Sequence, residues 1–241
     1  LKNFMNKKFL LIIPTLNEYR NISKIYKKIK QKYKLANILF IDDNSIDGSK
    51  DEIANLCKKD KKVDCIFRNK KLGIGSAHKL GIKFAKKKKY QFVCTIDCDG
   101  SHDPIYIASM FKLIKNKDIV ITNRFLIENA LNDWELKRII VTKLRYYLVK
   151  ILLNSELDGS GGFRLYDLKK VKLKDIFEAK DNNYSFFWES TFLLEKKYNI
   201  CEIPIKLPTR SMGSSKMRFK DITNGFIYLL IIFIKYRIKF F

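Results

Sequence analysis

The 241-residue chain carries 49 Lys and Arg residues against 25 Asp and Glu residues, which is a formal net charge of +24. A hydrophobic content of 46% with 18 Phe residues excludes a disordered chain, and a chain of this length can bury one substantial core. The five Cys residues form no Cys-x-x-Cys pair and the chain has two His residues, so neither a disulfide framework nor a zinc site is indicated and a reducing cytoplasm is expected.

The excess of positive charge narrows the classes of partner. It favours anionic partners, which are phosphorylated substrates, acidic lipid surfaces or nucleic acid. A compositional preference for Lys on solvated faces would produce the same excess, so the motifs have to select the partner.

The first unit of the chain reads as strand, polar loop and helix. Residues 9–13 are a short apolar run ending at Pro14, which predicts a buried parallel strand. The run is too short for a targeting segment, and no small-residue cleavage site follows it. After the loop that contains Glu18, the apolar residues from Asn21 onward keep helical spacing with Lys on the opposite face.

The second and third units repeat this plan. Residues 37–41 predict a strand that ends in an acidic loop containing Asp43, and Ser49 with Glu52 predicts a capping box at the next helix. Residues 63–67 predict a third strand, and the loop after it contains two Gly and two Lys residues. That loop allows backbone to approach a phosphate or a sugar, or it is a plain turn, and Gly-x-Gly alone does not separate the two.

The fourth predicted strand, residues 92–96, ends in a loop with two carboxylates, Asp97 and Asp99. Carboxylates one residue apart at a strand end can face one point, and such hard oxygen ligands hold Mg²⁺ or Mn²⁺ while phosphate oxygens complete the shell. A nucleotide diphosphate is therefore the expected ligand. Asp and Gly also build plain polar turns, which is the alternative interpretation.

Strands that alternate with helices predict an α/β fold with a mostly parallel sheet flanked by helices. Ligands of such sheets bind at the carboxyl ends of the strands, where Glu18, Asp43, Asp97 and Asp99 all fall. We expect these four carboxylates to meet in one crevice. No Gly-x-Gly-x-x-Gly follows the first strand, so a Rossmann dinucleotide site is not indicated.

The second half of the chain places an arginine, Arg124, just past another predicted strand. A guanidinium there can hold a pyrophosphate or an acceptor phosphate, or it can be an ordinary surface arginine. Asp158 lies in a Gly-rich loop and could face the crevice or belong to a bare turn. The remaining expected segments are a helix at 105–114, a strand at 118–122, a basic amphipathic helix at 135–153, a helix at 184–194, a strand at 201–205 and a flexible basic loop at 209–216.

We expect residues 1–220 to form a single catalytic domain and residues 221–241 an apolar and basic C-terminal helix. Its nine consecutive apolar residues, 226–234, span about 14 Å as a helix against about 30 Å of bilayer hydrocarbon, so this run is not expected to cross a membrane. Basic residues then alternate with apolar ones, which is typical of an interfacial anchor; a helix packed on the domain is the alternative.

In combination, these segments resemble a known family. PTLNE, IDDNSIDGS, KKLGIGSAHKLGI, DCDGSHDP, NRF, GGFRLY and EIPIKLPTRSMGSSK, in this order and spacing, resemble the family 2 glycosyltransferases, and among them the dolichol- or polyprenol-phosphate mannose synthases. The resemblance runs from about Phe9 to Lys216. It implies a nucleotide-diphospho-sugar transferase (GT-A, Rossmann-like) fold and metal-dependent transfer of mannose from GDP-mannose to a polyprenyl (dolichyl) phosphate, with inversion at the anomeric carbon.

The resemblance also implies residue roles. Asp97, Asp99 and Arg124 are the implied catalytic residues, and Asp99 with Ser101 would hold Mg²⁺ or Mn²⁺. Arg124, Arg210 and Lys216 would hold phosphates, and Asp97 would act as a base or anchor a sugar hydroxyl. The implied donor-binding residues are Pro14, Leu16, Glu18, Ile41, Asp43, Asp97, Cys98, Asp99, Arg210 and Lys216.

Two departures from the family pattern leave alternatives open. Leu16 stands where an aromatic residue is common, so a sister enzyme that uses a UDP-sugar, glucose or N-acetylglucosamine, or another acceptor is the main alternative. Ser101 stands where the family often has a Gln metal ligand, and its hydroxyl can bind a metal directly or through water.

The implied lipid acceptor gives the basic charge a partner. We expect the protein to lie peripherally on an anionic membrane at its cytoplasmic face, or to depend on a membrane partner subunit. A basic nucleic-acid-binding protein is the distant alternative. We expect no nucleic-acid partner, because four strand-end carboxylates would repel phosphate unless a metal intervened.

Overall fold

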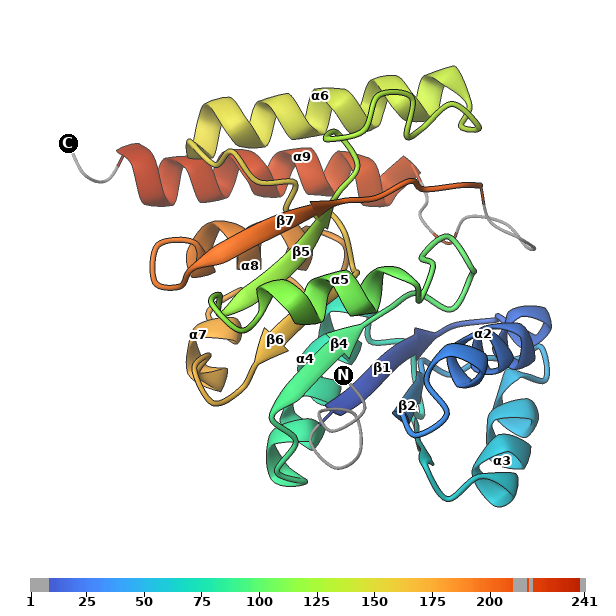
Figure 1. Cartoon of the computed structure of the whole chain (residues 1–241). Coiled ribbons are helices and arrows are strands. Elements are labelled where there is room, and N and C mark those ends of the chain that lie inside the picture. Colours follow the sequence, from blue (N-terminus) through green and yellow to red (C-terminus); the bar gives the residue numbers. More distant parts are fainter. Residues whose placement is uncertain (1–8, 210–215, 217–218, 239–241) are drawn as a thin grey trace.

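A seven-stranded sheet with the order β3-β2-β1-β4-β6-β5-β7 forms the middle layer of the molecule (Figure 1). The computed structural model describes residues 9–209, 216 and 219–238. β6 runs antiparallel to both of its neighbours and the other pairs are parallel, which confirms the predicted mostly parallel sheet. The strands are β1 (Phe9–Thr15), β2 (Asn37–Asp42), β3 (Val63–Phe67), β4 (Phe92–Thr95), β5 (Ile119–Asn123), β6 (Arg164–Asp167) and β7 (Ile200–Pro204).

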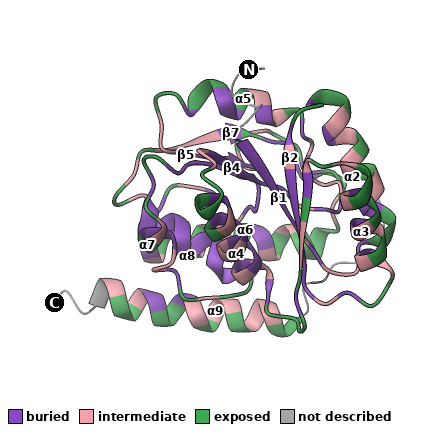
Figure 2. Cartoon of the chain, turned by 90° about the horizontal axis from the view of Figure 1, so that it is seen from below, coloured by how far each residue is buried: buried purple, intermediate pink, exposed green. Residues whose placement is uncertain are grey.

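Helices cover both faces of this sheet and enclose two hydrophobic cores. Successive strand residues point to opposite faces, so Leu11 of β1 belongs to the core that includes residues of α2, α3 and α5, whereas Ile12 belongs to the core that includes residues of α4 and α8. Buried residues accordingly fill the strands and the inner sides of the helices (Figure 2). The helices are α2 (Tyr19–Lys32), α3 (Ser49–Lys59), α4 (Ile74–Lys87), α5 (Tyr106–Leu113), α6 (Leu136–Leu153), α7 (Leu173–Ile176), α8 (Ser185–Leu194), α9 (Phe219–Phe233) and the π-helix η1 (Ile234–Ile238).

The predicted capping box at the start of α3 is wrong. The residue before the helix is Gly48, in a left-handed conformation with φ 90°, and the backbone N–H of Ser49 donates to the Asp47 carboxylate at 3.0 Å. The Ser49 hydroxyl instead accepts a hydrogen bond from the backbone N–H of Glu18 at 3.0 Å, and the Glu52 carboxylate accepts one from the Ser23 hydroxyl. The side chains of Ser49 and Glu52, which the local pattern assigns to a cap, therefore form hydrogen bonds with α2 and with the loop before it.

The C-terminal helix α9 lies beside α6 at one edge of the molecule (Figure 1). Leu229 and Ile232 are buried, and the Tyr228 hydroxyl donates a hydrogen bond to Glu189 of α8 at 2.9 Å. The side of α9 that carries these residues is thus packed on the rest of the chain. Among the helices that the structure describes, none has the length and apolarity needed to cross a membrane.

Candidate active site

A cleft lies at the carboxyl ends of β1, β2 and β4, where parallel strands direct their following loops to one edge. It encloses about 770 Å³ when its open mouth is included. The start of α9 and the loop before α8 complete its walls. Its lining residues are Pro14, Thr15, Leu16, Glu18, Asp43, Arg68, Lys71, Gly73, Ile74, Ala77, Asp97, Cys98, Asp99, Asn183, Tyr184, Lys216 and Asp221.

A buried ion pair forms one side of this cleft. The Arg68 guanidinium lies 2.8 Å from the Asp43 carboxylate, and both side chains are less than 10% exposed. Arg68 also donates to the Ser76 hydroxyl at 2.6 Å and to the Gly73 carbonyl at 3.2 Å. The Asp43 carboxylate in turn accepts hydrogen bonds from the backbone N–H groups of Leu72 and Gly73. Asp43 and Arg68 therefore fasten the Gly-rich loop to the ends of β2 and β3.

The glycines of that loop are required by neighbouring protein atoms. Gly73 has φ +93°, and a Cβ there would lie 2.4 Å from the backbone oxygen of Asn182. A Cβ on Gly75 would lie 2.5 Å from Cβ of Phe186. Contact with the loop before α8 thus explains both glycines, and approach of this backbone to a phosphate or a sugar stays a prediction.

The acidic loop after β4 brings its polar residues together. Asp97 keeps 31% of its side chain exposed toward the cleft, whereas Asp99 is 6% exposed. The Ser101 hydroxyl and backbone N–H both donate to one oxygen of Asp99, at 2.6 and 3.0 Å. Nδ1 of His102 accepts a hydrogen bond from the backbone N–H of Asp97 at 3.2 Å, which holds the loop closed.

A second buried ion pair lies past the end of β5. Nε of Arg124 donates to Asp158 at 2.8 Å, and the backbone N–H of Arg124 donates to the same oxygen at 3.3 Å. Two neighbouring glycines of the loop before β6 lie close to this pair and to the acidic loop. A Cβ on Gly161 would lie 3.3 Å from the Arg124 guanidinium, and one on Gly162 would lie 3.1 Å from the Asp97 carboxylate. The loop before β6 therefore runs between Arg124 and Asp97.

Charges around Arg124 alter the proton affinity of its neighbours. Burial by itself would raise the pKa of Asp158, but the Arg124 guanidinium and the Ser160 hydroxyl hold that pKa below its ordinary value. Desolvation and the positive charge of Arg124 lower the pKa of Arg145, on α6, to about 10. Two guanidinium charges thus interact here with one carboxylate, so the local charge is positive and an added anion would be stabilised.

The residues of the acidic loop are suited to Mg²⁺ or Mn²⁺, which prefer carboxylate and hydroxyl oxygens. Asp99 and Ser101, the predicted metal ligands, lie in direct contact, and Asp97 faces the same cleft. Within the described part of the chain, no three His, Cys, Asp or Glu side chains form a preassembled metal cluster. Asp99 and Ser101 are the oxygen ligands that this loop would offer a divalent ion, and substrate phosphates would supply the others.

The structure places most of the predicted donor residues on this one cleft. Pro14, Leu16, Glu18, Asp43, Asp97, Cys98, Asp99 and Lys216 all line it. Ile41 is fully buried in the sheet, close to Gly81 of α4. Arg124 is 8% exposed and lies beside the loop before β6, next to the cleft rather than in its lining. Arg210 lies outside the described residues.

Several lining residues were not predicted. Arg68 directly follows β3, so the rule that ligands bind at the carboxyl ends of strands would have found it. Asn183, Tyr184 and Asp221 come from the second half of the chain and reach the cleft only through the packing of α8 and α9. No local sequence signal distinguishes these three from other polar residues.

Two curated proteins resemble the chain over most of its length. It is 27% identical over 210 residues to the undecaprenyl-phosphate mannosyltransferase of Micrococcus luteus, with 86% of each chain covered. It is also 27% identical over 222 residues to the polyprenol monophosphomannose synthase of Mycolicibacterium smegmatis, a match that covers 90% of this chain and 83% of the relative.

Solved structures share the fold. Glucosyl-3-phosphoglycerate synthase from Mycobacterium tuberculosis, in complex with Mn²⁺, UDP-glucose and phosphoglyceric acid, matches with a TM-score of 0.66 at 15% identity, over 94% of this chain and 79% of that chain. The same enzyme with Mg²⁺ and UDP matches with a TM-score of 0.60 at 13% identity, over 97% of this chain and 83% of that chain. This likeness is one of fold.

The family is shown by its sequence model. A model of glycosyl transferase family 2 matches residues 10–173, which is more than half of the chain and includes β1 to β6. The expected GT-A nucleotide-sugar transferase fold is confirmed by the sheet and by the structural neighbours. The protein therefore belongs to glycosyl transferase family 2 and is a glycosyltransferase.

Proposed function

We propose that the enzyme transfers mannose from GDP-mannose to a polyprenyl phosphate, with inversion at the anomeric carbon and with Mg²⁺ or Mn²⁺ as cofactor. The observation that carries this proposal is the shared cleft, which is lined by eight of the ten predicted donor residues, all but Ile41 and Arg210. The two mannosyltransferase relatives, at 27% identity over most of the chain, support mannose as the sugar and a polyprenyl phosphate as the acceptor.

The chemistry requires little proton transfer. An oxygen of the acceptor phosphate is already anionic and attacks the anomeric carbon of mannose; the bond from that carbon to the donor's diphosphate oxygen breaks, and GDP leaves with the electron pair. Catalysis then consists of positioning both substrates and neutralising charge. In this proposal Lys216 neutralises the diphosphate from the cleft wall, and Arg210 does so from the neighbouring segment.

Asp99 and Ser101 would hold the divalent ion, which when bound neutralises the leaving diphosphate. Asp97 is the most exposed of the four strand-end carboxylates and would anchor a sugar hydroxyl or act as a base. Asp97 lies close to Gly162, and the neighbouring Gly161 lies close to Arg124, which supports a role of Asp97 near both substrates.

Arg124 would bind the acceptor phosphate. It lies across the loop before β6 from Asp97, and Arg145 is close enough for the two guanidiniums to repel. A phosphate bound there would relieve that repulsion while Asp158 keeps Arg124 in position. The acceptor oxygen would then approach the sugar from the side opposite the diphosphate, as inversion requires.

The lipid acceptor places the proposed reaction at a membrane. We infer that residues 1–220 act as the catalytic domain, residues 221–241 contribute to membrane association, and the protein lies peripherally at a cytoplasmic membrane face. Dependence on a membrane partner subunit is the alternative arrangement. The net charge of +24 supports attraction to anionic lipid.

A donor with another base is the second candidate. Leu16 lines the cleft at a position where the family commonly has an aromatic residue, which favours a test of UDP-glucose and UDP-N-acetylglucosamine. Such an enzyme would keep the same fold, metal ligands and acceptor chemistry. GDP-mannose remains our proposal because both relatives are named for mannose transfer.

The proposal is tested by transfer of radiolabelled sugar to a short polyprenyl phosphate, with Mg²⁺, with Mn²⁺ and with a chelator. We expect lipid-linked mannose from GDP-mannose, loss of product with the chelator, and at least a hundredfold loss in Asp99→Ala. Asp103→Asn is the matched control, because Asp103 lies in the same loop but pairs with Lys28 at 3.0 Å and does not line the cleft.

Each outcome has a definite meaning. Transfer from a UDP-sugar but not from GDP-mannose would overturn the donor and keep the acceptor. Full activity in the chelator or in Asp99→Ala would overturn the metal site. Inactivity with every donor, in a preparation supplied with membranes, would overturn the acceptor.

A further inference from the structure

Exposed hydrophobic side chains are concentrated on two helices of the described structure. Of the eighteen large hydrophobic side chains that are exposed, ten belong to α6, α9 and η1. These are Leu136, Ile140, Leu144, Tyr147 and Ile151 on α6, Phe219, Ile227, Leu230 and Ile231 on α9, and Ile234 on η1. A concentration of exposed apolar side chains on a protein surface marks an interaction site.

On α6 the exposed residues form a stripe. Leu136, Ile140, Leu144, Tyr147 and Ile151 are spaced by three or four residues, so they lie on one side of the helix. The first and the last of them are each 71% exposed. The opposite side is buried on the domain through Thr142, Val149 and Leu153. Burial on the domain therefore accounts for one side of α6 only.

The C-terminal helix repeats this arrangement. Leu229 and Ile232 are buried, whereas Ile227, Leu230 and Ile231 are each more than half exposed. A helix that is apolar on all sides normally lies in a core or in lipid. Within the described residues, the exposed apolar side chains of α9 are thus left uncovered, although a helix of this composition is normally buried.

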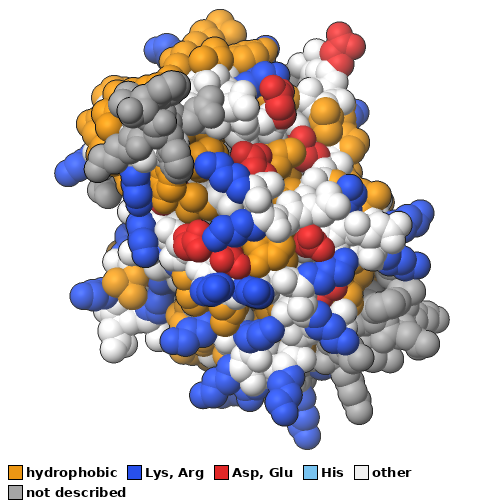
Figure 3. Space-filling model, turned by 90° about the vertical axis from the view of Figure 1, so that its left-hand side faces the viewer, with side chains coloured by type: hydrophobic (Ala, Val, Ile, Leu, Met, Phe, Trp, Pro, Cys, Tyr) orange, Lys and Arg blue, Asp and Glu red, His pale blue; other side chains and the backbone are white. Residues whose placement is uncertain are grey.

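The two stripes form one surface. α6 and α9 run side by side along the top of the molecule in Figure 1, and their residues are in contact. Hydrophobic side chains gather at that same edge in the space-filling view of Figure 3. We call this surface the α6/α9 face, and it consists of Leu136, Ile140, Leu144, Tyr147, Ile151, Ile227, Leu230, Ile231 and Ile234.

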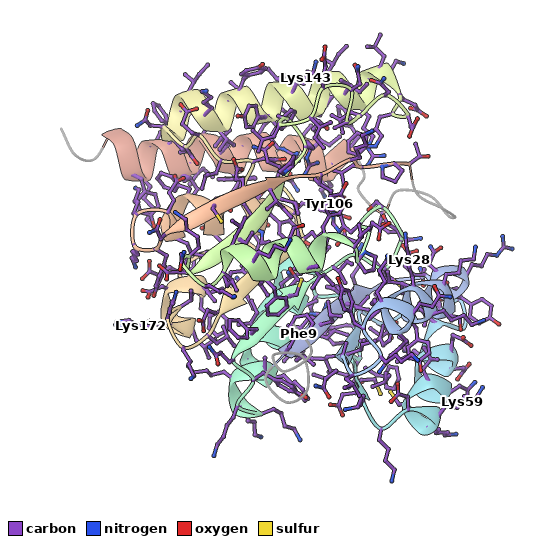
Figure 4. The ribbon with its side chains drawn as sticks, viewed as in Figure 1. Phe9, Lys28, Lys59, Tyr106, Lys143 and Lys172 are labelled. Atoms are coloured by element: carbon purple, nitrogen blue, oxygen red, sulfur yellow. The ribbon has the colours of Figure 1, made fainter. Side chains whose placement is uncertain are left out.

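The charged residues within α6, α9 and η1 are almost all basic. The 18 residues of α6 include five basic residues and no acidic residue, and the α9 and η1 sequences add three basic residues and one acidic residue, Asp221. Lys143 is exposed and stands on the outer side of α6 (Figure 4). Apolar side chains flanked by Lys and Arg match an anionic bilayer, which offers hydrocarbon beneath a layer of phosphates.

We propose that the α6/α9 face is the surface through which the enzyme lies on an anionic lipid bilayer, with the apolar stripes inserted at the boundary between headgroups and acyl chains. The inference deepens the proposed function and rests on it, since the proposed acceptor is a lipid. Two copies of the chain are a poorer occupant, because pairing the face with itself would bring two strongly basic helices together.

The orientation that follows suits a lipid phosphate. α6 also contains Arg145, whose charge interacts with that of Arg124. The helix is about 10 Å thick, so the proposed phosphate site lies within about one helix diameter of the bilayer surface. An acceptor phosphate can then reach Arg124 while its polyprenyl chain stays in the hydrocarbon.

The experiment measures partition of the purified chain onto vesicles of phosphatidylcholine alone or with 30 mol% phosphatidylglycerol. We expect wild type to bind the anionic vesicles at least tenfold more tightly. Leu144→Glu combined with Ile231→Glu should weaken that binding at least thirtyfold, because both carboxylates would enter the apolar layer. Leu35→Glu is the matched control; Leu35 is 43% exposed, close to Leu144 at 49%, and lies away from the face. Its binding should stay within twofold of wild type.

Three results would overturn the inference. The first is a double variant that folds, by circular dichroism, and binds vesicles like wild type. The second is equal loss in Leu35→Glu. The third is a lipid-free wild-type dimer, seen by sedimentation, that the double variant abolishes, since that would assign the face to a second copy.

A transfer assay keeps this inference separate from the proposed function. With a short water-soluble polyprenyl phosphate, the double variant should keep wild-type activity, whereas with a long-chain acceptor in vesicles it should lose at least tenfold. Wild type that binds vesicles through the face but transfers no sugar would refute the proposed function and leave the membrane surface standing. Equal activity of variant and wild type on the vesicle substrate would refute the surface.

Discussion

The two sides of the site are built from the same parts, an arginine that directly follows a strand and a buried aspartate 2.8 Å away. Arg68 follows β3 and meets Asp43, and Arg124 follows β5 and meets Asp158. Asp43 directly follows the neighbouring parallel strand β2, 25 residues before Arg68 in the sequence. Asp158 comes from the loop before the antiparallel strand β6, with the whole of α6 in between.

This difference separates an arginine that holds a loop in place, Arg68, from one that we propose binds a phosphate, Arg124. Arg68 donates to three neighbouring residues and fastens a loop, so most of its hydrogen-bonding capacity is already used by protein. Arg124 points one end of its guanidinium at Gly161 and has a second cation, Arg145, nearby. An arginine with a positive neighbour attracts an anion, whereas an arginine surrounded by carbonyl, hydroxyl and carboxylate oxygens does not.

The largest effect should come from Arg124. We expect Arg124→Ala to lower sugar transfer by about 10³-fold, which is about 4 kcal/mol, because a cation facing the reacting phosphate is lost. Affinity for GDP-mannose, measured by calorimetry, should change less than threefold. Arg124→Lys should recover part of the rate, since it keeps the charge but not the planar geometry. A large loss of donor affinity in Arg124→Ala would place this arginine on the donor side and contradict the proposed difference between Arg68 and Arg124.

The two glycine loops should differ in what they tolerate. Gly73→Ala should cost about 2–4 kcal/mol of unfolding free energy, because φ is +93° and the new Cβ would meet backbone at 2.4 Å. Gly161→Ala should cost at most about 1 kcal/mol, since the nearest atom is the movable end of Arg124, 3.3 Å away. Urea denaturation measures both. Equal costs would show that the loop before β6 is as rigidly held as the one beside Arg68.

The free energy of unfolding should depend on pH through His78, a buried residue of α4. Burial lowers the pKa of this histidine to about 3, and its ring meets Phe187 of α8 at 4.9 Å. In the unfolded chain His78 binds a proton near pH 6.5, whereas in the folded chain it does so only near pH 3. The contribution of neutral His78 to the free energy of unfolding is therefore complete above pH 6.5 and is lost as pH falls toward 3.

The expected loss is about 2 kcal/mol by pH 5, at about 1.4 kcal/mol per pH unit. Denaturation of wild type and of His78→Leu between pH 7 and pH 5 measures it as the difference between their slopes. Parallel slopes would mean that the folded protein accommodates a charged ring at this position.

The smallest effect should come from Arg68→Lys. We expect donor KM to rise about tenfold, because an ammonium group cannot keep the contacts to Asp43, Ser76 and Gly73 together and the loop loosens. The KM for a short polyprenyl phosphate should stay within twofold. A change confined to the acceptor KM would reverse the assignment of the two sides.

Local patterns in the sequence predicted much of the site, and their failures share one cause. The strand-end rule placed Glu18, Asp43, Asp97 and Asp99 on one cleft, and all four line it. The capping pattern assigned the side chains of Ser49 and Glu52 wrongly, because they form hydrogen bonds with residues about 30 positions away rather than within their own helix. Tertiary partners override local capping whenever they reach the same atoms.

The sequence by itself determined the order of the strands and helices other than β6 and α7, and the acidic strand ends, because the hydrophobic pattern decides which face of each element is buried. Only the tertiary structure decided that β6 runs antiparallel, that Asp158 meets Arg124, and that Asn183 and Asp221 complete the cleft. It also decided which sides of α6 and α9 stay uncovered. Each of these depends on pairing segments far apart in the chain, and an apolar stripe does not specify what will cover it.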